Sequence, residues 1–220
     1  MNTAVFLNIH ADTYARFAHT RAQLLQGSKE SQASALGDVL SEMACEVIEQ
    51  VFMVLLQENQ HHSQTGESEK VIQQILEAIR KYMPWSVSFF GNDRLVPLVE
   101  DLSKTIRVED ESVYMTYPIE QQLTQQVKAS SQKLAEGESR EIANSLKLLT
   151  EVIDVGVTHL IREPKKSLKF NFVVDKTLNG VINMTTHLGY KRLEKLGTQL
   201  DQQVAATYVD HFLKFMRHPA

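Results

Sequence analysis

The strongest constraint on the fold is a helical hydrophobic period in residues 36–54. Apolar residues there recur every three or four positions, as they do on the buried face of an α-helix. The stripe contains Leu36, Leu40, Met43, Val47, Val51 and Val54, and it is widened by Val39, Ile48, Phe52 and Leu55. Because an apolar stripe this broad has to be covered on several sides, the sequence predicts a central helix packed against several neighbours.

The same period recurs along most of the chain. The stretches that show it are 6–24, 72–83, 95–106, 123–134, 142–160, 174–188 and 200–215. Only five proline and nine glycine residues occur in 220 residues, which is little material for a β-architecture with many turns. A chain of this length can bury one core without splitting into two. We therefore expect an all-α fold, a single-domain bundle of about seven or eight helices over residues 1–220.

The ends of two helices can be placed from glycine and proline. The first helix is expected to end at Gly27. The helix over 72–83 is expected to end at Pro84, because the proline ring disfavours a helical residue before it.

Two short segments do not follow the helical period. In residues 85–90, Trp85, Val87 and Phe89 alternate with serine, and residues 112–117 are rich in β-branched and aromatic side chains. Either segment could be a short strand or an extended loop packed on the bundle. Residues 168–174 also alternate, so the start of the penultimate helix could be extended.

Cysteine content and apolar run length indicate the compartment. Cys45 is the single cysteine, so it cannot form an intramolecular disulfide, and its place among helical apolar positions predicts a buried core residue. A secretory signal has basic residues before its apolar segment, and no lysine or arginine precedes Arg16. The longest strongly apolar stretch, residues 47–56, is about half the length that a membrane-spanning helix needs. We expect a cytoplasmic protein with no membrane partner.

Charge is distributed unevenly along the chain. The net charge is −4, yet residues 162–195 hold eight basic and three acidic side chains. This local excess could attract an anion, a nucleic acid or an acidic partner. Because the whole chain is acidic, nucleic-acid binding is not expected.

Motifs for metal, cofactor or nucleophilic chemistry are lacking. A carboxylate-bridged di-metal site needs two Glu-x-x-His pairs, and the only such spacing joins Glu58 to His61. His159, His187 and His211 lie in the last three long helices, where they could converge on a metal or act in acid–base chemistry, or serve as hydrogen-bonded structural residues. No nucleophile elbow, phosphate loop or dinucleotide fingerprint occurs. We predict no metal and no cofactor.

Aromatic residues concentrate in the segment 82–117. This segment holds six of the chain's aromatic side chains: Tyr82, Trp85, Phe89, Phe90, Tyr114 and Tyr117. Such a group can line an apolar ligand pocket, anchor a protein interface or close the bundle as a secondary core.

Two functions fit these observations, and no segment carries the motif of a known family. The first is a non-catalytic helical protein that acts through protein–protein interaction or self-association, most simply as a two-fold dimer. Its surface would include aromatic residues of the last helix, Tyr208, Phe212 and Phe215. The alternative is a carrier or enzyme whose bundle encloses a small apolar ligand, with His159 or His187 as its polar contact. The candidate binding residues are Trp85, Phe89, Phe90, Tyr114, Tyr117, His159 and His187.

Overall fold

The computed structural model describes residues 3–58 and 65–218, with side chains for residues 3–52 and 66–218. The helices are α1 (Ala11–Leu25), α2 (Ala33–Glu58), α3 (Thr65–Val87), α4 (Asn92–Thr105), α5 (Gln121–Ala135), α6 (Ile142–Val157), α7 (Glu163–Ser167), α8 (Phe172–Leu196) and α9 (Gln202–Leu213). A π-helical turn, Thr158–Arg162, joins α6 to α7, and a short 3₁₀ turn, Ser139–Glu141, precedes α6. The strands are β1 (Thr3–Ile9), β2 (Ile106–Glu109), β3 (Ser112–Ile119) and β4 (Met216–Arg217). The prediction of a mostly helical, multi-helix fold with short extended segments is confirmed.

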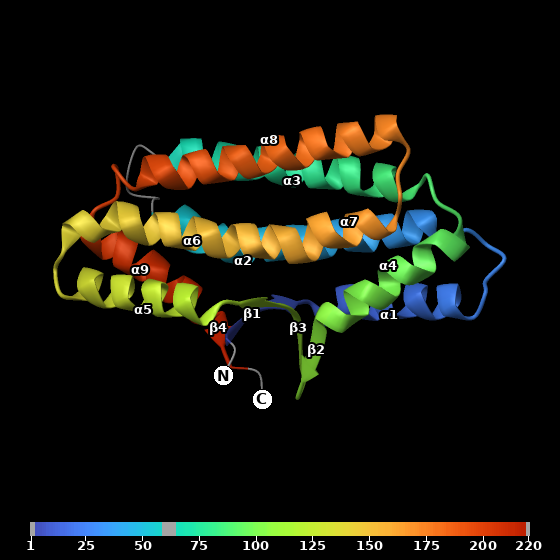
Figure 1. The fold of residues 1–220 in the computed structure, drawn as a ribbon, viewed down its shortest axis with the longest axis horizontal. Coiled ribbons are helices and arrows are strands. Elements are labelled where there is room, and N and C mark those ends of the chain that lie inside the picture. The colour runs from blue at the N-terminus through green and yellow to red at the C-terminus, as the bar shows by residue number, and fades with distance from the viewer. Residues whose placement is uncertain (1–2, 59–64, 219–220) are drawn as a thin grey trace.

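Figure 1 shows how these elements are layered. Helices α3 and α8 lie along one long side, α2 with α6 and α7 runs through the middle, and the sheet lies on the opposite side between α5 and α1. An ion pair of 2.8 Å between Glu67 and Lys195 joins the start of α3 to the end of α8, so these two helices are antiparallel. The chain ends near the sheet, where β4 pairs with β1.

The sheet is antiparallel, with strand order β2-β3-β1-β4. Strand β3 confirms the extended segment expected near 112–117. The prediction that Phe6 and Ile9 belong to the first helix is wrong, because residues 3–9 form β1 and the helix begins at Ala11. Nearly every residue of β1 is buried, on both faces. A strand covered on both faces is a continuous apolar run, and its periodicity does not separate it from a helix.

A buried carboxylate joins this strand to the central helix. Glu46 of α2 accepts hydrogen bonds from the backbone N–H of His10 (2.9 Å) and the hydroxyl of Thr13 (2.6 Å), at the first turn of α1. Since the first N–H groups of a helix have no partner within it and favour an anion, Glu46 stabilises the corner between β1 and α1.

The expected end of α3 at Pro84 is wrong, and so is the extended segment at 85–90. The helix continues through Pro84 to Val87. Tertiary packing explains this continuation: a Cβ added at Gly37 of α2 would lie 2.7 Å from Pro84 Cα, so the two helices touch at this glycine. Close packing of α3 against α2 holds a helical turn that proline alone would disfavour.

The start of α8 follows a capping signal. The side chain of Asn171 accepts a hydrogen bond of 3.0 Å from the backbone N–H of Val174, and the helix begins at Phe172. The apolar residues that alternate in residues 168–174 therefore do not form a strand, and the extended start considered for this helix is not observed.

Among the described side chains, two hydrophobic clusters form the core. One gathers residues of α6, α9 and β1, and the other gathers residues of α1, α4 and the first half of α2. Val47 and Leu160 pack against both. Tyr208 and Phe212 are fully buried in the first cluster, so the expectation that they form an exposed surface on the last helix is wrong. No helix in the described ranges has the length and apolarity to cross a membrane.

Candidate functional site

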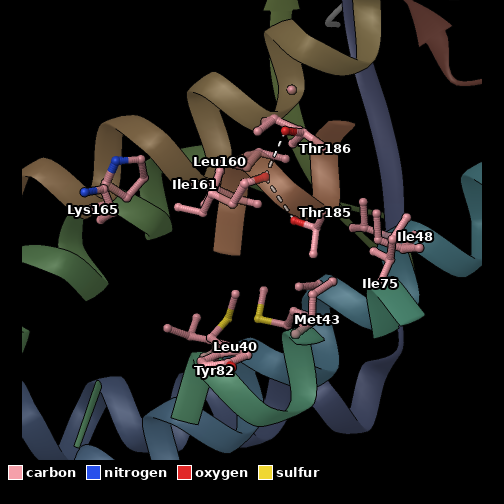
Figure 2. Close-up of a pocket in the computed structure, with 18 of the residues that line it drawn as sticks. Leu40, Met43, Ile48, Ile75, Tyr82, Leu160, Ile161, Lys165, Thr185 and Thr186 are labelled. Atoms are coloured by element: carbon pink, nitrogen blue, oxygen red, sulfur yellow. Dashed lines mark hydrogen bonds between the residues drawn. The ribbon is translucent and has the colours of Figure 1, made fainter. Parts of the chain in front are cut away.

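The main candidate site among the described residues is an apolar cavity of about 250 Å³, which we call the central cavity. It lies between the pair α2 and α3 on one side and the π-helical turn, α7 and α8 on the other. In Figure 2, one wall carries Leu160, Ile161, Thr185 and Thr186, and the facing wall carries Leu40, Met43 and Tyr82. Both hydrophobic clusters contribute side chains to its lining, including Leu7, Phe52, Met115 and Leu168.

Small residues and a helical irregularity keep this space open. Ala44, Ala78 and Gly189 line the cavity, on α2, α3 and α8. The π-helical turn widens the chain between α6 and α7, and such turns often mark functional sites. Leu160 in that turn is half-buried, and it lines the cavity as well as packing against both hydrophobic clusters.

The threonines of α8 do not make this wall polar. The hydroxyl of Thr185 donates to the carbonyl of Val181 (2.9 Å), and that of Thr186 donates to the carbonyl of Ile182 (2.8 Å), as Figure 2 shows in part. Both hydroxyls are thus satisfied within their own helix.

A small polar group lies beside the cavity at α6, and Tyr190 is its member in the lining. Tyr190 donates a hydrogen bond of 2.7 Å to Asp154 Oδ1, and Arg162 Nη1 donates one of 2.8 Å to the same oxygen. Burial opposes the charged form of Asp154, but these two hydrogen bonds outweigh it and hold the pKa of the carboxyl below its ordinary value. Burial and the hydrogen bond to this carboxylate raise the pKa of Tyr190. Asp154 is therefore charged and Tyr190 neutral at neutral pH.

Tyr117 of β3 reaches the same part of the cavity. Its phenol lies against Gly156, where an added Cβ would be 2.8 Å from the ring and 3.0 Å from the hydroxyl. Within the described residues the hydroxyl of Tyr117 makes no hydrogen bond. Burial raises the pKa of Tyr117, so the hydroxyl is neutral and can donate.

Tyr117 is the one candidate binding residue that lines the central cavity. Tyr114 points to the other face of β3, where it contacts Phe6 edge-on at 5.8 Å. Phe90 is buried against Phe170. Trp85 and Phe89 contact each other at 5.0 Å and remain 37% and 50% exposed.

The candidate histidines lie outside the cavity lining. His159 Nδ1 is 3.0 Å from the carbonyl of Val155, and His187 is exposed on α8. His211 Nε2 is 3.0 Å from the carbonyl of Gln50. In the part of the chain that the structure describes, no three His, Cys, Asp or Glu residues gather as metal ligands would. The Glu58–His61 pair lies outside the described side chains.

No pattern in the sequence connected Asp154, Arg162 and Tyr190 into one group. Asp154 and Arg162 are eight positions apart, which is about 12 Å along a regular helix. That is farther than the three- and four-residue spacings at which helical side chains are neighbours. The contribution of Tyr190 depends on the crossing of α6 and α8, which no local pattern contains.

No family model, curated protein or solved structure matches this chain.

Proposed function

We propose that the protein binds an elongated apolar molecule in the central cavity. The observation that supports this is the cavity itself: about 250 Å³ of space whose walls are almost wholly aliphatic and aromatic. An engineered apolar cavity of about 150 Å³ stays dry and binds benzene. The central cavity is larger, so it suits a hydrocarbon chain or a ring system of more than one ring.

Packing also favours a ligand. The apolar side chains that line the cavity lack part of the van der Waals contact that a filled core would give them. A ligand that fills the cavity would supply this contact.

The composition of the lining favours an apolar ligand over one held by a histidine. Ligand pockets are mostly apolar with a few placed polar groups. Tyr117 and Tyr190 line the cavity, whereas His159 and His187 do not. This arrangement supports a role in binding an apolar chain that does not depend on His159 or His187.

Displacement of an apolar fluorophore by hexadecanol tests the proposal. The delipidated full chain should bind the fluorophore and release it to hexadecanol. Ala44→Phe should weaken binding at least tenfold, because Ala44 lines the cavity and is half-buried. Ala129→Phe is the matched control, since Ala129 is exposed on α5 outside the lining. Equal binding by both variants, or none by the wild type, would contradict the proposal.

A second candidate role is self-association through the end of the molecule where α3 ends and α8 begins (Figure 1). Trp85, Phe89, Phe172 and Val173 are exposed there, with Phe172 at 79% and Val173 at 71%. Exposed apolar side chains mark interfaces, and a two-fold dimer is the commonest assembly.

Light scattering at micromolar concentration tests this role. We expect a mass about twice 25.0 kDa that falls to the monomer in Phe172→Asp. Val108→Asp, at another exposed apolar position, should leave the dimer intact. A wild-type mass of 25.0 kDa at every concentration would exclude the dimer.

A further inference from the structure

A cluster of basic residues lies at one end of the central cavity. Arg162, Lys165, Lys166 and Lys169 line a second pocket, together with residues from the start of α8, and we call these four residues the basic rim. The second pocket shares Lys165, Phe170 and Ile182 with the central cavity. The apolar space and the basic rim are therefore adjacent, with these three residues between them.

Two of the four cations are neutralised by neighbours. Arg162 is paired with Asp154 at 2.8 Å. Lys165 is paired with Asp175 of α8, and its ammonium lies 5.9 Å from the centre of the Phe170 ring. The Lys165 side chain is only 14% exposed, so its stem runs along the apolar wall while its charge faces the rim.

The other two cations have no such neighbour. Lys166 and Lys169 are exposed, and neither forms an ion pair with a described residue. The two carboxylates of Asp154 and Asp175 thus neutralise only two of the four basic side chains. The remaining positive charge lies beside the cavity, where it attracts anions. The side chains of Asn179 and Asn183 line the same pocket and offer uncharged donors.

We propose that the ligand of the central cavity is a single-chain anionic amphiphile, a long-chain carboxylate or alkyl phosphate, whose head lies on the basic rim. This inference rests on the proposed function, because the chain of the amphiphile occupies the central cavity. The head remains in the solvent-exposed pocket, where lysine and asparagine side chains donate charge-assisted and neutral hydrogen bonds to its oxygens. Lys166 and Lys169 belong to the basic excess of residues 162–195 and to neither hydrophobic cluster. Binding an anionic head gives these two exposed lysines a role.

Competition binding with matched probes tests this inference. The probes are hexadecanol, hexadecanoate and hexadecyl phosphate, which share one chain and differ in the head. We expect the delipidated full chain to bind hexadecanoate about tenfold more tightly than hexadecanol, the size of one charge-assisted contact. The preference should shrink as salt rises, since the rim is exposed.

Charge removal locates the head. The double variant Lys166→Gln, Lys169→Asn should reduce the preference to about twofold or less while binding hexadecanol as the wild type does. Asparagine suits position 169, because Lys169 has φ of +48° and asparagine tolerates that conformation. The control variant Lys128→Gln, Lys147→Gln removes two exposed lysines of α5 and α6 and should keep the full preference.

The outcomes separate the two proposals. If hexadecanol and hexadecanoate bind equally tightly to the wild type, the anionic head is refuted and apolar binding stands. If the rim variant keeps the full preference, or the control variant loses it as fully, the head does not lie on the basic rim. If neither probe binds, the proposed function itself fails. Tighter binding of hexadecyl phosphate than of hexadecanoate would identify the head as a phosphate, and the reverse order a carboxylate, and either result supports an anion on the rim.

Discussion

Gly156 lies where α6 meets the phenol of Tyr117, and a methyl group added there has two opposing effects. Alanine in place of glycine in a helix stabilises it by about 1 kcal/mol. The new Cβ, however, would lie 2.8 Å from Tyr117 Cζ and 2.9 Å from Cε1. Forcing extra volume into a packed site costs about 1–3 kcal/mol. We therefore expect Gly156→Ala to lower the free energy of unfolding by up to about 2 kcal/mol.

Gly180 provides the matched control. It lies inside α8, and nothing is within 4 Å of an added Cβ. Gly180→Ala should raise the free energy of unfolding by about 1 kcal/mol. Urea denaturation at pH 7 measures both variants, and the difference between them isolates the contact with Tyr117.

A double-mutant cycle tests the cause. Tyr117→Leu removes the ring atoms that the methyl would meet, so Gly156→Ala should become stabilising by about 1 kcal/mol in that background. Stabilisation of the wild type by Gly156→Ala, to the same extent as by Gly180→Ala, would refute the close packing of Tyr117 on α6.

Two further predictions concern burial and pH. Leu36→Asp should prevent folding, because Leu36 is fully buried and an unpaired buried charge costs several kcal/mol, whereas Val108→Asp, at a position 58% exposed, should leave the helical circular dichroism unchanged. Asp154→Asn should lower the free energy of unfolding by about 1 kcal/mol at pH 7. Because the pKa of Asp154 is lowered in the folded state, this stabilisation is present above the unfolded-state pKa and is lost as the pH falls through the folded-state pKa. Urea denaturation at pH 7 and below pH 4 checks it, and an equal difference from the wild type at both pH values would contradict the assignment.

The sequence predicts helices well where one apolar face meets a core. The stripe from Leu36 to Val51 became α2, which contacts both hydrophobic clusters. Prediction from periodicity fails at β1, because burial of both faces removes the alternation that marks a strand. Prediction of the helix end fails at Pro84, because the packing of α3 against Gly37 outweighs the local preference of proline.

The central cavity could not be predicted from the same stripes. A leucine that lines a cavity and one that faces only a partner helix give the same periodicity, and Leu160 is of the first kind. The aromatic content of 82–117 did point to Tyr117, whereas Trp85 and Phe89 are exposed. The sequence showed the basic excess in residues 162–195. It did not show that the turn from α7 to α8 brings Lys165 and Lys169 together at one end of the cavity.

Nuclear Overhauser effects from methionine methyl groups to a bound chain test the central claim most directly. Met43, Met83 and Met115 line the central cavity, whereas Met216 is buried outside it. With methyl-labelled protein and unlabelled hexadecanol, the account predicts intermolecular contacts to the three lining methionines and none to Met216. Contacts to Met216 alone, or to no methionine at saturating hexadecanol, would contradict binding in the central cavity.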